Sequence, residues 1–221
     1  MPDHRAILFD FDGVLGMTME DNFEAWKAVL AEYGADLAPE EYYPREGMAL
    51  YQLAKALCRE KGINEQHASE IVAKKEGHYM KRHVFRFYPG VESFITELAL
   101  HTVPIAVVTT GHLPRLRQSV PVGFLSQFNG IVTGDQIERG KPFPDPYLKG
   151  AELVGVAPQH CIVVENSPMG IAAGKAAGSF CVGITSTLGA SYLKGADVTI
   201  SSFADLSGLS VIKTLFSGPL H

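Results

Sequence analysis

The sequence has few cysteines, a single tryptophan and no long apolar run. Its three cysteines, Cys58, Cys161 and Cys181, are an odd number with wide spacing. That usage argues against a disulfide scaffold or a zinc knuckle and is typical of a protein in a reducing compartment. No segment approaches the ~20 apolar residues that a membrane span requires, and acidic residues interrupt the N-terminal stretch where a signal peptide is apolar. We therefore expect a cytoplasmic protein without a membrane partner.

An excess of positive charge is also missing. The 221 residues carry a formal net charge of −5, and 46% of them are hydrophobic. A chain without a broad basic field has no general attraction for nucleic acid, so any anionic ligand must be bound by a few local groups. The length allows one sizeable core and a smaller module. We expect a monomer whose partner is a small molecule, with no nucleic acid.

Six short apolar runs, rich in β-branched and aromatic residues, alternate with amphipathic stretches. The alternation predicts a parallel sheet covered by helices. The runs cover residues 6–12, 104–110, 130–134, 161–166, 180–185 and 197–200, and helical patterns with Gly or Pro at their edges cover 89–100, 113–120, 145–155 and 169–178.

Residues 16–85 have a different pattern, with helical periodicity in three stretches and no convincing strand. We interpret this segment as a helical insertion. The α/β domain would then consist of residues 1–15 and 86–221.

Side chains suited to chemistry follow four of the predicted strands. Ligands of open α/β sheets bind outside the carboxyl ends of the strands, so these side chains are expected to share one site. In strand order they are Asp10 and Asp12, then Thr109 and Thr110, then Lys141, then Glu165 and Asn166.

The pair Asp10 and Asp12 suggests a metal ion. Residues two apart on a strand point the same way, and two carboxylates that close repel each other unless a cation lies between them. Oxygen ligands of this kind suit Mg²⁺. The candidate ligands are Asp10, Asp12 through its backbone carbonyl, and Asn166 or Glu165.

Taken singly, each residue has a structural interpretation. An Asp after a strand often forms a turn or caps a helix, a lone lysine is usually a solvated charge, and Asn166 or Ser167 can cap a helix that begins near Pro168. Their position at successive strand ends favours a shared site. Two acids, a hydroxyl, a lysine and an oxygen-rich metal site are typical of phosphoryl transfer through an aspartyl-phosphate.

Four motifs, "DFDGV", "VVTT", "GKPFPDPY" and "VVENSPMGI", resemble in order and spacing those of the haloacid dehalogenase (HAD) superfamily. "TMEDNFEAWKAVL" and "FYPGV" resemble its β-phosphoglucomutase-like branch, which has a helical C1-type cap. The resemblance implies a Rossmann-like three-layer α/β core with residues 16–85 as an inserted cap domain. It also implies a magnesium-dependent phosphatase that acts on a small phosphorylated metabolite, such as a sugar phosphate.

The resemblance assigns a role to each motif residue. Asp10 would be the nucleophile and a magnesium ligand, and Asp12 the general acid and base. Thr109 would bind a phosphoryl oxygen, while Lys141 would hold the nucleophile and offset charge in the transition state. The resemblance also suggests a cis peptide after Lys141, whereas the general preference of X–Pro bonds favours trans.

The remaining candidates complete the metal shell and the substrate pocket. Glu165 and Asn166 would ligate magnesium directly or through water; many members of the family carry Asp where Asn166 stands, so we expect weaker magnesium binding. Thr110 and Gly111 are candidates for substrate binding in the core. Lys75 is the cap candidate, although "AKKE" is equally typical of a solvated helix face.

Other activities of the family fit less well. A dehalogenase or a phosphonatase would lack an aspartate at Asp12. A hexose-phosphate mutase is the main alternative, but it needs donors for a second phosphate, and this chain has Leu50, Gly111 with Leu113, and Asn22 where a mutase has Arg, Ser with Asn, and His. Hydrolysis is therefore favoured over mutase chemistry. A non-catalytic phosphometabolite sensor is a further alternative, and the four filled catalytic positions argue against it.

Overall fold

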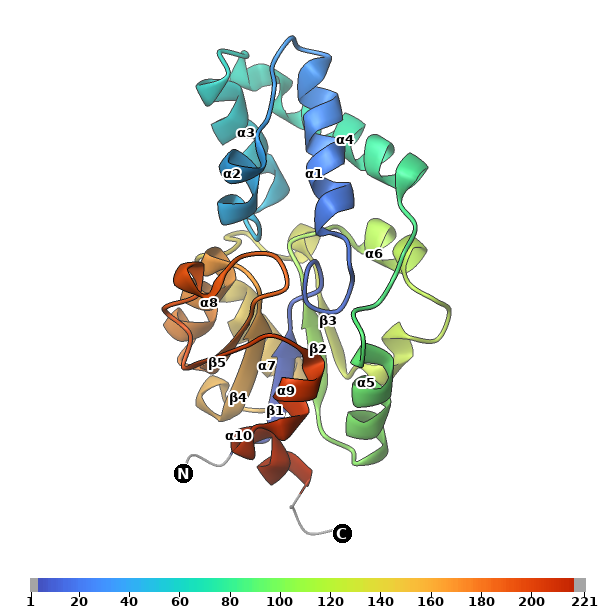
Figure 1. Ribbon diagram of the computed structural model, residues 1–221, viewed down its shortest axis with the longest axis vertical. Helices are drawn as coiled ribbons and strands as arrows, with labels where there is room; N and C mark the ends of the chain where they lie inside the picture. The colour runs from blue at the N-terminus through green and yellow to red at the C-terminus, as the bar shows by residue number, and fades with distance from the viewer. Residues whose placement is uncertain (1–3, 217–221) are drawn as a thin grey trace.

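The computed structural model describes residues 4–216 and contains a six-stranded parallel sheet below a group of helices (Figure 1). Neighbouring strands pair in the order β3-β2-β1-β4-β5-β6, and every pairing is parallel. All six predicted strands are present. They are β1 (Ala6–Phe9), β2 (Ile105–Val108), β3 (Gly130–Val132), β4 (Cys161–Glu165), β5 (Phe180–Ile184) and β6 (Val198–Ile200).

Helices cover both faces of the sheet. In β1, Ile7 and Phe9 face one hydrophobic core, while Ala6 and Leu8 face the other, as alternation along a strand requires. The first core includes residues of α5 (Val91–Leu100), α6 (Leu113–Ser119), α9 (Phe203–Gly208) and α10 (Ser210–Lys213), and the second includes residues of α7 (Asp145–Val154) and α8 (Pro168–Ala176).

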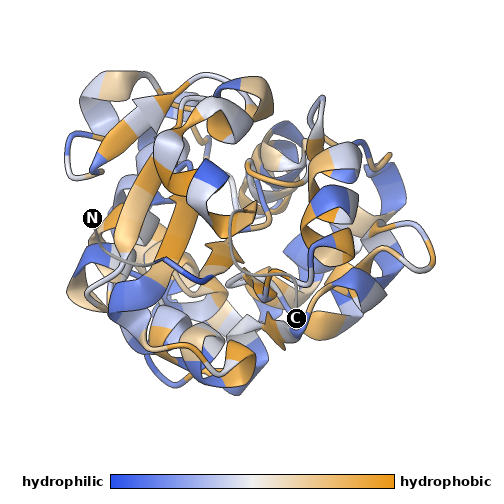
Figure 2. Cartoon of the chain, turned by 90° about the horizontal axis from the view of Figure 1, so that it is seen from below, coloured by the Kyte–Doolittle hydropathy of each residue, from blue (hydrophilic) through white to orange (hydrophobic). Residues whose placement is uncertain are grey.

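Figure 2 shows the hydropathy of each residue along the chain. The strands are hydrophobic, and the hydrophilic segments lie mainly on the surrounding helices and loops. A strand buried on both faces must be apolar along its whole length, which explains the continuous apolar runs. The three-layer Rossmann-like α/β core predicted from the sequence is confirmed. The three cysteines are buried free thiols that pack in these cores and in the cap.

The inserted segment forms a helical cap above the carboxyl edge of the sheet (Figure 1). It has a hydrophobic core of its own, which includes Trp26, Leu57 and Ile71. The boundaries predicted at residues 16 and 85 stay a prediction. The cap helices are α1 (Met19–Ala31), α2 (Pro39–Tyr42), α3 (Leu50–Glu60) and α4 (Ala68–Arg82). No helix within residues 4–216 is long and apolar enough to cross a membrane.

Two linkers join the cap to the core, and they pair with each other. Gly16 forms an antiparallel bridge with Phe87, and the amide of Met17 donates to the carbonyl of Arg86 over 2.8 Å. A Cβ on Gly16 would lie 2.8 Å from the ring of Phe85. The two linkers are thus in close contact with each other at the junction of cap and core.

Candidate active site

Asp10 and Asp12 lie just beyond the end of β1, at the carboxyl edge of the sheet. We predicted a strand over 6–12, but β1 ends at Phe9, and the chain turns at Gly13 with φ +85°. A Cβ on Gly13 would meet the side chain of Asn166 at 2.0 Å. Glycine is required here both for the backbone conformation and for the approach of Asn166.

The ammonium group of Lys141 lies between two buried carboxylates. It donates to Asp10 Oδ1 over 2.6 Å and to Glu165 Oε1 over 2.5 Å, and the side chain is only 1% exposed. Burial disfavours the charged amine, but the two carboxylates outweigh burial and raise the pKa of Lys141. Burial raises the pKa of Asp10, and Glu165 raises it further while Lys141 opposes both. The Lys141–Pro142 peptide is cis, against the general preference for trans.

Glu165 is surrounded by protein donors. Its Oε1 also accepts from the hydroxyl of Tyr147 over 2.9 Å, and its Oε2 accepts from the amides of Asn166 and Ser167 and from the Ser167 hydroxyl. A Cβ on Gly170 would collide with this carboxylate, so the first turn of α8 packs directly against it. Glu165 is therefore arranged to position Lys141, and direct contact with a metal ion would require it to give up these bonds.

Asn166 offers an oxygen to a cation. Its Nδ2 donates to Thr187 Oγ1 over 3.0 Å, while its buried Oδ1 has no hydrogen-bond partner among the described residues. Ser167, the next residue, caps α8 as the sequence suggested, by accepting from the amide of Gly170. Within residues 4–216 no three His, Cys, Asp or Glu side chains form a metal-binding group. A hard cation here would instead use Asp10, a backbone carbonyl and the Asn166 amide oxygen, a set that suits magnesium.

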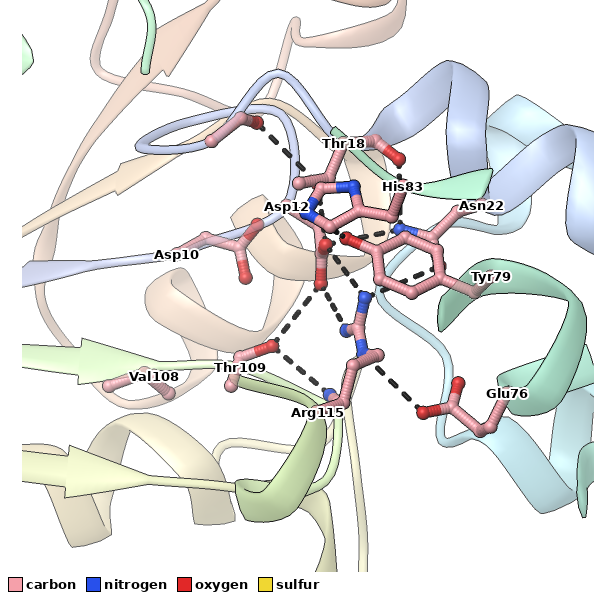
Figure 3. A network of polar contacts seen from close by, with 12 residues as sticks. Asp10, Asp12, Thr18, Asn22, Glu76, Tyr79, His83, Val108, Thr109 and Arg115 are labelled. Atoms are coloured by element: carbon pink, nitrogen blue, oxygen red, sulfur yellow. Dashed lines mark hydrogen bonds and ion pairs between the residues drawn. The ribbon is translucent and has the colours of Figure 1, made fainter. Parts of the chain in front are cut away.

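The carboxylate of Asp12 points toward Thr18 and Asn22, on the side of the cap (Figure 3). Its Oδ1 accepts from Thr18 over 2.6 Å and from Asn22 over 3.1 Å, two residues at the start of the cap helix α1. Its Oδ2 accepts from Thr109 over 3.4 Å. The two aspartates therefore have separate partners, although we expected both side chains to address one site from the same side.

Arg115 is the main partner of Asp12, and the sequence analysis missed it. Its Nη2 donates to Asp12 Oδ2 over 2.7 Å and its Nη1 to Asp12 Oδ1 over 3.2 Å. Burial opposes ionisation of Asp12, but this guanidinium more than compensates and holds the pKa of Asp12 well below its usual value. The available signal was position: Arg115 lies in the first turn of α6, just after the carboxyl end of β2.

The loop after β2 supplies the other core candidates. Thr109 is 2% exposed, and its hydroxyl also accepts from the amide of Gly111 over 3.0 Å. Gly111 has no side chain where Arg115 passes: a Cβ there would lie 2.0 Å from Arg115 Nη2. Thr110 is half-buried beside them. Gly111 thus makes room for the arginine.

Lys75 reaches the same region from the cap. It is fully buried, so the alternative of a solvated helix face is wrong for this residue. Its Nζ donates to Asn22 Oδ1 over 2.5 Å and lies 2.9 Å from Glu76 Oε1. The structure brings all the candidate residues to one edge of the sheet under the cap; their catalytic and binding roles stay a prediction.

Comparison with known proteins defines the class of this arrangement. Residues 7–184 match a family model described as haloacid dehalogenase-like hydrolase. Hexitol phosphatase A of Escherichia coli (strain K12) is 30% identical over 92% of this chain and 93% of its own length. Beta-phosphoglucomutase of Bacillus subtilis (strain 168) is 24% identical over 92% of each chain.

A solved structure of CbbY from Rhodobacter sphaeroides in complex with phosphate is also similar. Its TM-score is 0.79, its identity is 28%, and the match covers 95% of this chain and 99% of that one. The chain belongs to the haloacid dehalogenase-like hydrolases. It is a hydrolase-family enzyme of this superfamily's β-phosphoglucomutase-like branch.

Proposed function

We propose that this chain is a magnesium-dependent phosphatase that hydrolyses a small phosphorylated metabolite through an aspartyl-phosphate. The observation that carries the proposal is the 2.6 Å contact between Lys141 Nζ and Asp10 Oδ1. This contact orients one buried carboxylate as a nucleophile, and a second carboxylate, Asp12, lies two residues further on and faces the cap.

In the first half-reaction, an oxygen of Asp10 attacks phosphorus and the bond from phosphorus to the leaving oxygen breaks. Arg115 holds the pKa of Asp12 low, so Asp12 becomes protonated only when the incoming substrate displaces this guanidinium; it then gives its proton to that oxygen as the alcohol departs. Thr109 and Lys141 donate to the phosphoryl oxygens and offset the charge that they gain.

In the second half-reaction, water attacks the phosphorus of the aspartyl-phosphate. Asp12, now a carboxylate, takes a proton from this water, and the bond between phosphorus and Asp10 breaks to release phosphate and restore the carboxylate. The cap lies over these groups and leaves Asp10 only 6% and Asp12 only 5% exposed. Exclusion of bulk water therefore requires this closed arrangement, and substrate entry requires the cap to open at the paired linkers around Gly16 and Phe87.

Magnesium fits the residues present. Asp10, the backbone carbonyl of Asp12 and the Oδ1 of Asn166, to which no described residue donates, would hold it, with Glu165 acting on it only through water. When bound, it would neutralise charge on the phosphoryl group and favour the ionised form of Asp10. Hexitol phosphatase A, a relative named for a hexitol, supports a phosphorylated sugar or polyol as the substrate class, and the phosphate complex of CbbY supports a site for a phosphoryl group.

The test is phosphate release from a panel of sugar, polyol, nucleotide and small organic phosphates, each with magnesium and with a chelator. We expect release that depends on magnesium, with one substrate class well ahead of the others in kcat/KM. Equal release with the chelator would remove magnesium from the proposal. Absence of release, together with isomerisation of a hexose phosphate after priming with a hexose bisphosphate, would replace the phosphatase by the mutase. Absence of both activities would favour the sensor.

A further inference from the structure

Arg115 is a buried cation that connects the core to the cap. It begins in the core helix α6 and is 6% exposed. Beyond Asp12 it reaches Asn22 Oδ1 at 3.4 Å, and its guanidinium lies 4.8 Å from the ring centroid of Tyr79. Its Nε lies 3.6 Å from Glu76 Oε2. Figure 3 shows the arginine between Asp12 on one side and these cap residues on the other.

A second buried cation lies beside it. The Nζ of Lys75 donates to Asn22 Oδ1, and Arg115 Nη1 donates to the same oxygen. Two cations that share one acceptor repel each other in an environment of low dielectric constant, unless anions lie close. In this structure Asp12 and Glu76 supply those anions. The region is therefore built to hold negative charge.

Catalysis disturbs this balance. The leaving oxygen of a phosphomonoester must reach Asp12, yet both oxygens of Asp12 accept from Arg115. Engagement of Asp12 by the substrate must therefore free donors of Arg115, whose buried Nε already has no hydrogen-bond partner within residues 4–216. A guanidinium that loses its carboxylate partner inside a protein is strongly disfavoured, so a replacement anion is needed at this position.

We infer that the substrate carries a second anionic group, a carboxylate or another phosphate, on the leaving-group side, and that Arg115 receives it with Lys75 beside it. A planar guanidinium suits either group, because it can donate two parallel hydrogen bonds to their oxygens. Arg115 would then be the specificity-determining residue of the enzyme. The inference rests on the proposed phosphatase activity and narrows its substrate class.

The test compares matched phosphomonoesters that differ in the second anion. Phosphoglycerate is compared with glycerol phosphate to test a carboxylate as the second anion. A hexose bisphosphate is compared with the corresponding hexose monophosphate to test a second phosphate. The wild-type enzyme should prefer a compound with a second anionic group to its partner without one by roughly tenfold or more in kcat/KM, the strength of a hydrogen bond between charged groups. Whichever pair shows the preference identifies the anion.

The variants assign the preference to its residue. Arg115→Met should bring the preference close to one and Arg115→Lys should retain part of it. Arg117→Met, which removes an exposed arginine of the same helix, should leave it unchanged. Lys75→Met removes the cation that the cap places beside Arg115, so it should weaken the preference. A wild-type preference for the compounds without a second anionic group, or an equal effect of Arg115→Met and Arg117→Met, would overturn the inference.

Binding keeps this test separate from that of the phosphatase proposal. Calorimetric affinities of the same pairs for the wild-type protein need no turnover. Selective binding of the compounds with a second anionic group, without hydrolysis, would refute the phosphatase and keep the anion site. Hydrolysis of both members of each pair without selectivity would keep the phosphatase and refute the anion site. If Arg115→Met does not fold, the wild-type preference and the Lys75→Met variant still decide.

Discussion

Lys141 and Glu165 form a buried ion pair with 2.5 Å between Nζ and Oε1, and both side chains are at most 1% exposed. The same ammonium group holds Asp10 at 2.6 Å, so one cation serves both the proposed catalytic carboxylate and a structural one. Glu165 also receives hydrogen bonds from Tyr147 and from the start of α8. The orientation of the proposed nucleophile is thus tied to the packing of the core.

Replacing Lys141 should therefore affect stability as well as catalysis. Lys141→Met leaves Asp10 and Glu165 buried without their cation and should lower the free energy of unfolding by roughly 3–5 kcal/mol. Urea denaturation measures this loss. The double variant with Glu165→Gln should lose less than the sum of the single variants, because one unpaired carboxylate is gone. Lys149→Met, at an exposed pair, is the control and should change little. An additive double variant would mean that the two residues do not stabilise each other.

Replacement of Asp10 and replacement of Asp12 should impair turnover in different ways. Asp10→Asn removes the nucleophile and should abolish turnover with the fold intact, since an amide cannot form the aspartyl-phosphate. Asp12→Asn should lower kcat by about 10²–10⁴-fold with an alkyl phosphate. With p-nitrophenyl phosphate, whose leaving group needs no proton, it should still release a burst of nitrophenol in rapid-mixing experiments. A normal burst from Asp10→Asn would exclude Asp10 as the nucleophile. Absence of a burst from Asp12→Asn would contradict the assignment of Asp12 as the general acid and base.

Gly13 should be irreplaceable for a reason beyond its backbone angle. Gly13→Ala places a methyl group against Asn166 and also strains a residue with φ +85°. Gly34→Ala is a matched control, because Gly34 has φ +73° and open space around it. Both variants should lose about 1–2 kcal/mol of stability from backbone strain. Only Gly13→Ala should also weaken magnesium binding in calorimetry; equal magnesium affinity in both would show that Asn166 is not a ligand.

Asn166 should limit the affinity for magnesium. Asn166→Asp adds a negative charge to the ligand set and should tighten magnesium binding on the order of tenfold, since ligand charge tunes the affinity of such sites. Thr187→Val removes the hydrogen-bond acceptor of Asn166 Nδ2 but adds no charge, so it should not tighten binding. Calorimetric titration of both variants with magnesium compares them directly. An unchanged affinity in the Asn166→Asp variant would count against this ligand.

The sequence predicted that the candidate residues lie at one edge of the sheet, because parallel strands place their carboxyl ends together. It therefore located Asp10, Thr109, Lys141 and Glu165 without coordinates. It could not separate the partners of Asp10 and Asp12. That division depends on β1 ending at Phe9 and on the side of the turn that the cap covers.

The position of Arg115 after β2 was a signal, but its burial and its contact with Asp12 could not be predicted, for a related reason. Its burial depends on Gly111 leaving space and on Asn22 and Tyr79 arriving from a domain distant in sequence. No local pattern encodes that meeting of elements. Lys75 illustrates the same limit, since an amphipathic helix does not reveal whether a lysine faces solvent or a second domain.

Glu46 should give the protein a pH-dependent stability. Glu46 lies at the end of the short turn after α2, half-buried. Burial, reinforced by the charge of Asp12 and opposed by Tyr42, Lys75 and Arg115, raises its pKa to about 7. An unfolded chain ionises Glu near pH 4.3.

Between these two values the folded state binds more protons than the unfolded state. The contribution of Glu46 to stability therefore falls as pH rises from about 4.3 to about 7, and it is constant above and below this window. Glu46→Gln cannot ionise, so the variant should gain on the order of 2 kcal/mol relative to wild type across the window. Glu40→Gln, at an exposed position in the same segment, should show no such gain. Urea denaturation at several pH values measures both; parallel stability curves for wild type and Glu46→Gln would contradict the assignment.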